Sequence, residues 1–133
     1  MRCLTAVLAF LFASLVIGTG FAQSVQDDLI AKAFPGAKGE KVAGDHPLLK
    51  PAGEKEALVP KLRPFAAEQF KDAPPELTVM GAGKGYVVVS PLDLTSGLLG
   101  TSTWGIAGYE PVTAQAIVRN ALLWAHARPE VGK

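Results

Sequence analysis

The side chains best suited to chemistry are one carboxylate and two imidazoles. Asp93 directly follows an apolar segment and has hydroxyl side chains on either side. A carboxylate in that setting could bind sugar hydroxyls or act as a base, and it could equally cap the next turn by accepting backbone N–H groups. His46 precedes Pro47, which is typical of a turn, and His126 falls near the end of a predicted helix, where an imidazole can interact with terminal carbonyls.

A ligand site is predicted in residues 91–110, which are rich in glycine and have no sustained hydrophobic period. Long loops of this kind tend to be functional, and this one leaves the carboxyl end of a predicted strand, where ligands bind in open α/β sheets. Trp104 and Tyr109 stand beside glycines and could stack on a ligand or fold back onto the core. The predicted ligand-binding residues are Asp93, Thr95, Ser96, Trp104 and Tyr109.

Other motifs are incomplete. The glycines of residues 81–85 match neither the dinucleotide fingerprint, because Tyr86 takes the place of a glycine, nor the P-loop, because Gly85 follows Lys84. The residues around Ser102 do not match the nucleophile elbow of serine hydrolases, because Trp104 takes the place of the second glycine of that motif. No carboxylate lies at the spacing from either histidine that is typical of a metal site. No catalytic residue, metal site or cofactor is therefore predicted.

The elements that would position the site follow from local patterns. Residues 77–80 and 86–90 read as two strands around a glycine-rich turn, and the second is apolar enough to be buried on both faces. Pro111 and an apolar stripe predict a helix over 111–127. Shorter helical segments are predicted at 25–34, 65–70 and 94–99, and residues 35–44 read as a solvated connection.

The first residues have the form of an export signal. A charged start, the apolar run Leu4–Ile17 and small residues before Gln23 predict cleavage between Ala22 and Gln23. The run is shorter than the roughly 20 residues of a membrane-spanning helix, so contact with a membrane is expected only through an uncleaved leader. The predicted division is a signal peptide at 1–22, a helix and linker at 23–44, and an α/β domain at 45–133, in a protein exported to the periplasm or the extracellular space.

Cysteine usage and charge exclude several functions. Cys3 would leave with the leader, so the mature chain would have no thiol nucleophile, disulfide or cysteine metal site. The chain carries 13 basic and 12 acidic residues, and loss of Arg2 would make these numbers equal. No basic run is interleaved with aromatic residues, so nucleic-acid binding is not expected.

Residues 45–127 resemble a known family, most strongly in 83–101, 105–111 and 120–125. They resemble the C-terminal end of bacterial glutamine-amidotransferase-like domains of flavodoxin-like fold, found in exported or envelope proteins of unknown function and in some glycoside-hydrolase-associated proteins. The resemblance implies an α/β fold in which a small sheet has flanking helices, like the C-terminal half of a flavodoxin-like three-layer domain. The family's catalytic cysteine and its C-terminal His-x-Glu pair are absent, which excludes amidotransferase activity.

The resemblance also implies a shortened sheet, since the chain has room for only one helix before residue 45. The strand at 86–90 would then have few neighbours, namely residues 77–80 and a candidate strand at 57–59. An unpaired edge invites pairing with another chain, so we expect a homo-oligomer or a protein partner at this edge. The favoured function is an exported module without catalysis that binds a small polar ligand or a partner protein. The alternatives are a carbohydrate or ester hydrolase with Asp93 and His46 as its acid–base pair, a structural envelope protein, and a truncated gene product.

Overall fold

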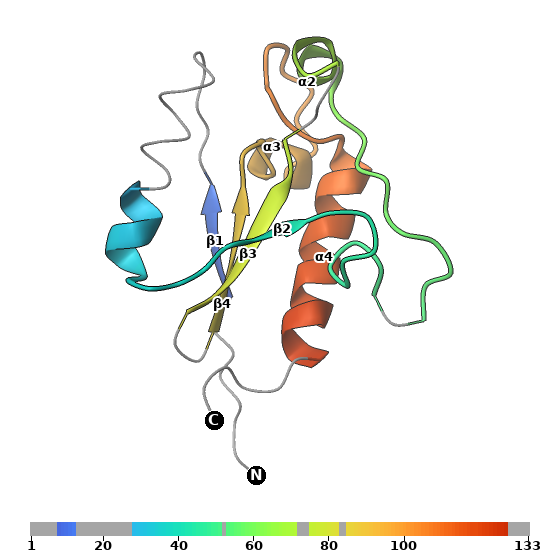
Figure 1. Cartoon of the computed structure of the whole chain (residues 1–133). Helices are drawn as coiled ribbons and strands as arrows, with labels where there is room; N and C mark the ends of the chain where they lie inside the picture. The colour runs from blue at the N-terminus through green and yellow to red at the C-terminus, as the bar shows by residue number, and fades with distance from the viewer. Residues whose placement is uncertain (1–7, 13–27, 52, 72–74, 83–84, 128–133) are drawn as a thin grey trace.

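A mixed four-stranded sheet with helices on both faces organises the chain (Figure 1). The computed structural model describes residues 8–12, 28–51, 53–71, 75–82 and 85–127. The strands are arranged in the order β1-β4-β3-β2, and β1 pairs parallel to β4 while the other pairs are antiparallel. The predicted small α/β fold is confirmed. The strands are β1 (Leu8–Phe12), β2 (Glu40–Val42), β3 (Leu77–Ala82) and β4 (Gly85–Ser90).

The pairing of β3 with β4 confirms the predicted pair of strands around a glycine-rich turn. Val79 lies opposite Val88, and Met80 lies opposite Val87, so β-branched and long apolar side chains face one another across the ladder. The turn residues 83–84 lie outside the described residues. The loop that leaves β4 therefore begins from a strand whose register is set by cross-strand packing.

β4 is buried along its length, as its composition predicts. Tyr86 and Val88 belong to the core on the face covered by α4 (Pro111–Ala127). Val87 and Val89 belong to a smaller core on the opposite face, where partly buried residues of 28–37 pack. Side chains alternate between the two faces of a strand, so a strand buried on both sides must be apolar at consecutive positions.

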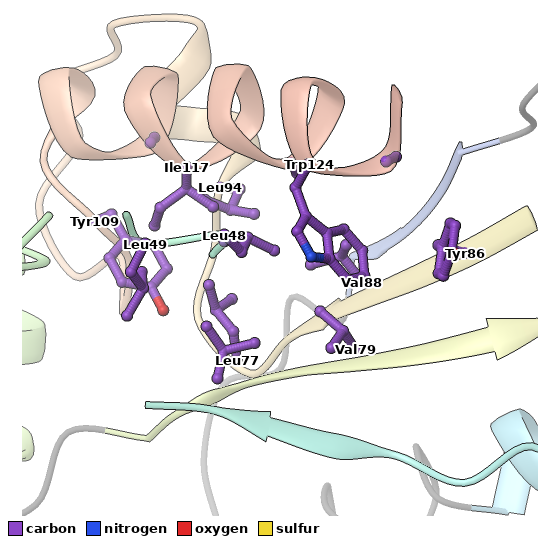
Figure 2. Close-up of a cluster of buried hydrophobic side chains, with 14 of the residues drawn as sticks. Leu48, Leu49, Leu77, Val79, Tyr86, Val88, Leu94, Tyr109, Ile117 and Trp124 are labelled. Atoms are coloured by element: carbon purple, nitrogen blue, oxygen red, sulfur yellow. The ribbon is translucent and has the colours of Figure 1, made fainter. Parts of the chain in front are cut away.

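The helix α4 confirms the most regular pattern in the sequence. Pro111 occupies its first position, where a missing N–H costs nothing. Its buried residues line one side, and Figure 2 shows Ile117 and Trp124 pointing from α4 towards the sheet. Two shorter helices, α2 (Pro64–Gln69) and α3 (Thr95–Leu98), lie where short helical turns are predicted, and residues 28–33 form the described part of the first helix. The first three residues of the predicted helix, 25–27, lie outside the described residues.

Two expectations about the sheet are wrong. Residues 40–42, predicted as part of a solvated connection, form β2 against β3, while residues 57–59 form no strand. β2 is a short edge strand in which Glu40 and Lys41 are exposed and only Val42 is buried. Charged residues are tolerated on an edge strand because part of its surface is in contact with water. The segment therefore has no apolar pattern from which a strand could be predicted.

The second neighbour of β4 comes from the predicted leader. Residues Leu8–Phe12 form β1, paired residue by residue with Tyr86–Ser90. None of the helices among the described residues has the length and hydropathy that a membrane-spanning helix needs. Cleavage after Ala22 stays a prediction, and it would remove β1 from the sheet.

Candidate functional site

Asp93 caps the helix that follows it. Its Oδ1 accepts the backbone N–H of Thr95 at 3.0 Å, and its Oδ2 accepts that of Ser96 at 3.1 Å. The residue is only 9% exposed. Each carboxylate oxygen therefore stabilises the first turn of α3 through a charge-assisted hydrogen bond. This is the capping role that was predicted as the alternative to ligand binding.

The backbone of Asp93 also joins the two ends of the long loop. Its N–H donates to the carbonyl of Ala107 at 3.0 Å, and its carbonyl accepts the N–H of Tyr109 at 3.2 Å. A Cβ on Gly108 would lie 2.6 Å from the Asp93 carbonyl oxygen. Glycine is needed there so that the two backbones can approach.

Arg63 is a buried residue that was not among the predicted site residues. It is 8% exposed and precedes α2. Its Nε donates to the carbonyl of Tyr109 at 3.1 Å, and its Nη2 donates to that of Ser96 at 3.0 Å. Its own N–H donates to the carbonyl of Gly108 at 2.9 Å. One guanidinium thus fastens α2, α3 and the end of the loop, and no local sequence pattern marks this long-range role.

Tyr109 is a core residue that a ligand cannot reach in this structure. It is 2% exposed and packs with Leu49 and Leu77 in the core beneath α4 (Figure 2). Burial raises the pKa of Tyr109 to about 12, and a side-chain hydrogen bond with Ser90 opposes part of that rise. The ring therefore seals the core, the second of the two roles considered for it.

Trp104, by contrast, projects from the loop into solvent. It is 85% exposed, and its ring centroid lies 5.4 Å from that of Phe65 in α2, with 66° between the ring planes. This edge-to-face geometry is favourable for aromatic pairs. Gly100 and Gly105 have φ values of +67° and +83° and supply the turns that present the ring. We call Phe65 and Trp104 the aromatic surface.

The structure brings only part of the predicted site together. Asp93, Thr95 and Ser96 share one turn, and Tyr109 meets Asp93 through the backbone but buries its ring. Trp104 belongs to the aromatic surface, where its described ring contact is Phe65. The predicted ligand site is thus divided between a cap, a core residue and an exposed ring.

His46 is placed away from Asp93. Its Nδ1 accepts the N–H of Leu48 at 3.1 Å, and its ring lies 5.6 Å from that of Trp124, which in turn lies 4.8 Å from Tyr86. Tyr86 is near the start of β4, and Asp93 lies beyond its end. A strand advances about 3.3 Å per residue, so the histidine and the carboxylate occupy opposite ends of β4.

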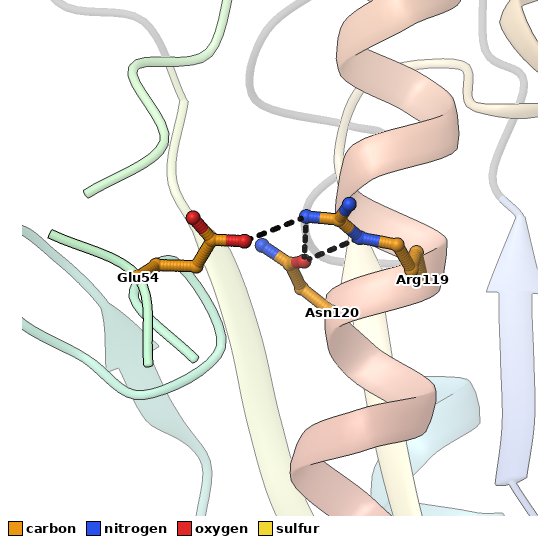
Figure 3. Close-up of polar contacts among 3 residues, drawn as sticks. All are labelled: Glu54, Arg119 and Asn120. Carbon is orange, nitrogen blue, oxygen red and sulfur yellow. Dashed lines mark hydrogen bonds and ion pairs between the residues drawn. The ribbon is translucent and has the colours of Figure 1, made fainter. Parts of the chain in front are cut away.

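A second polar cluster lies on α4 (Figure 3). Arg119 donates from Nε and Nη2 to Asn120 Oδ1, each at 3.2 Å, and its Nη2 lies 3.7 Å from Glu54 Oε1. The Arg119 and Glu54 side chains are 61% and 55% exposed, and such surface pairs contribute little stability. Arg119 thus links the buried Asn120 of α4 to Glu54 in the loop beside it.

The described residues contain no group of three or more His, Cys, Asp or Glu side chains that could hold a metal ion. Comparison of the chain with protein-family models, with curated proteins and with solved structures gives no match. The resemblance of residues 45–127 to amidotransferase-like domains stays a prediction from the sequence.

Proposed function

We propose that this protein is an exported α/β module without catalysis of its own that binds a partner protein through the aromatic surface. The observation that carries this proposal is the exposure of Trp104, which is 85% exposed although Phe65 packs against its ring. Exposed tryptophan is enriched among the residues that dominate protein interfaces. A ring supported by a second aromatic residue also loses less side-chain freedom when a partner binds.

A partner protein fits this geometry better than a small polar ligand does. Small-molecule sites are concave and bury most of the ligand, whereas the Trp104 ring stands outward from its loop. Asp93, the carboxylate predicted to bind a ligand, already accepts a backbone N–H on each of its oxygens. The hydrolase alternative lacks its acid–base pair in this arrangement, because His46 lies at the other end of β4.

The test is photo-crosslinking of the exported protein in its own host. A photoreactive amino acid replaces Thr103, which is exposed beside Trp104. We expect a discrete crosslinked protein in the otherwise unchanged chain, at least a tenfold weaker crosslink in Trp104→Ala, and an unchanged crosslink in Val59→Ala, which alters a residue that is 77% exposed. Circular dichroism confirms that both variants are folded.

Two outcomes would reject a protein partner at this surface. One is a crosslink of equal yield in Trp104→Ala. The other is saturable quenching of Trp104 fluorescence by mono- or oligosaccharides without any crosslinked protein, which would assign the ring to a small ligand instead.

A further inference from the structure

The edge of β4 opposite β3 is occupied by the segment that export would remove. β1 pairs with β4 in parallel over five consecutive residues, from Leu8 opposite Tyr86 to Phe12 opposite Ser90. Residues 8–12 fall inside the predicted leader, 1–22. Cleavage after Ala22 would therefore leave a fully formed strand with one side unpaired.

That open side would be an unusual edge, because β4 belongs to two cores. Tyr86 and Val88 contribute to the core beneath α4, and Val87 and Val89 contribute to the core on the other face. With β1 in place, Val87 and Val88 are 2% and 1% exposed. A strand added beside them would meet apolar surface above and below, so it must be apolar at consecutive positions. The run Leu-Ala-Phe-Leu-Phe of β1 has this composition.

We propose that, in the cleaved protein, the β4 edge is an acceptor site for a parallel, continuously apolar strand supplied by another protein. The incoming strand takes the register that β1 has with Tyr86–Ser90. Backbone hydrogen bonds would give affinity, and the two flanking cores would select apolar side chains, as in other cases of strand addition. This inference rests on the export and cleavage included in the proposed function, and it adds a site separate from the aromatic surface.

The described strands of a second copy match this edge poorly. The other outer strand, β2, has only three residues, and Glu40 and Lys41 are exposed on it. Placing those charges between two apolar cores would desolvate them without partners. Two copies could also pair β4 with β4 about a two-fold axis, but that pairing is antiparallel, whereas the occupant seen at this edge is parallel.

The test uses the exported protein, whose first residue is established by intact mass. A labelled peptide of residues 8–12 between flanking lysines is titrated against it by fluorescence anisotropy. Amide N–H groups alternate in direction along a strand. We therefore expect N-methylation at only one of two sets, residues 9 and 11 or residues 8, 10 and 12, to weaken binding at least tenfold.

The uncleaved chain is the matched control, because its own β1 fills the site. It should not bind the peptide, and Phe10→Pro in that chain should restore binding, since proline removes an N–H from the middle of β1. Circular dichroism checks that both chains are folded.

The outcomes separate the two proposals. A first residue other than Gln23 in the exported protein would reject the predicted cleavage and with it the proposed export processing. A folded protein that starts at Gln23 and does not bind the peptide would reject the acceptor site alone. Equal weakening by the two N-methylated sets, or a dimer that blocks the peptide, would also reject it.

Discussion

Two buried polar side chains, Tyr109 and Arg63, fasten the loop that leaves β4. The phenol of Tyr109 hydrogen-bonds with Ser90 near the end of the strand, and the guanidinium of Arg63 donates to carbonyls on the loop and on α3. A buried carbonyl that loses its donor costs about 1–3 kcal/mol. The loop is therefore held at both ends, and Trp104 is presented from a fixed frame.

The buried phenol makes stability depend on pH in the alkaline range. An unfolded tyrosine ionises near pH 10, whereas the pKa of Tyr109 in the folded protein is about 12. Its contribution is therefore complete below pH 10 and is lost as the pH rises from 10 to 12, because only the unfolded chain releases the proton there. We expect a loss of roughly 2–3 kcal/mol from this group.

Urea unfolding between pH 8 and pH 12 checks this expectation. The Tyr109→Phe variant is the control, since it keeps every other titratable group of the chain. The difference in unfolding free energy between the two proteins should shrink or reverse above pH 10. Parallel pH profiles for the two proteins would show that the phenol does not titrate with a raised pKa.

The helices α3 and α4 meet at a glycine. A Cβ on Gly97 would lie 2.5 Å from the Cβ of Ala114 and 3.2 Å from the Tyr109 carbonyl oxygen. Gly97 is buried, and Ala114 is fully buried. The short α3 thus approaches α4 more closely than a side chain at position 97 would permit. This close approach also fixes the position of the α3 turn that Asp93 caps.

Gly97→Ala should destabilise the protein by about 1–3 kcal/mol, the usual cost of an overpacked contact. Ala114→Gly alone should cost about 1 kcal/mol of helix propensity. The double variant should lose less than the sum of the two, because the second substitution makes room for the first. Chemical denaturation of the four proteins measures the coupling. Simple additivity would mean that the two positions do not touch. The control is Thr95→Ala, at an exposed position of α3, which measures the effect of an alanine substitution in this helix away from its contact with Ala114.

At the scale of the whole molecule, the two faces of the sheet are unequal. The core beneath α4 joins residues from β2, β3, β4, α4 and the connecting loops, whereas the opposite core joins Met80, Val87 and Val89 with partly buried residues of 28–37. Stability should therefore depend mainly on α4 and its contacts. The helix at 28–33 should be the first part of the described fold to open.

Two isoleucine truncations compare the faces directly. Ile117→Ala, at a fully buried position in α4, should cost about 3–4 kcal/mol, within the range for large core truncations. Ile30→Ala, at a partly buried position on the opposite face, should cost about 1 kcal/mol because less apolar area leaves water on folding. Guanidinium unfolding measures both. Equal losses would show that the second face contributes as much as the first.

The sequence by itself determined the elements with strong local signals. The proline and the apolar stripe of period 3.6 predicted α4, and the two short apolar runs around a glycine-rich turn predicted β3 and β4. Short helical turns were also predicted where α2 and α3 lie. The cap formed by Asp93 was also among the local possibilities, because its partners lie two and three residues away.

Only the tertiary structure decided what depends on contacts between distant residues. The charges of β2 gave no strand pattern, the bonds from Arg63 span 33 and 46 residues, and the pairing of β1 with β4 joins residues 8–12 to residues 86–90. The burial of Tyr109 and the exposure of Trp104 are likewise set by the elements around them. Neither residue's own type decides the matter, because an aromatic ring beside glycines can turn either inwards or outwards, and the choice depends on which apolar surface is within its reach.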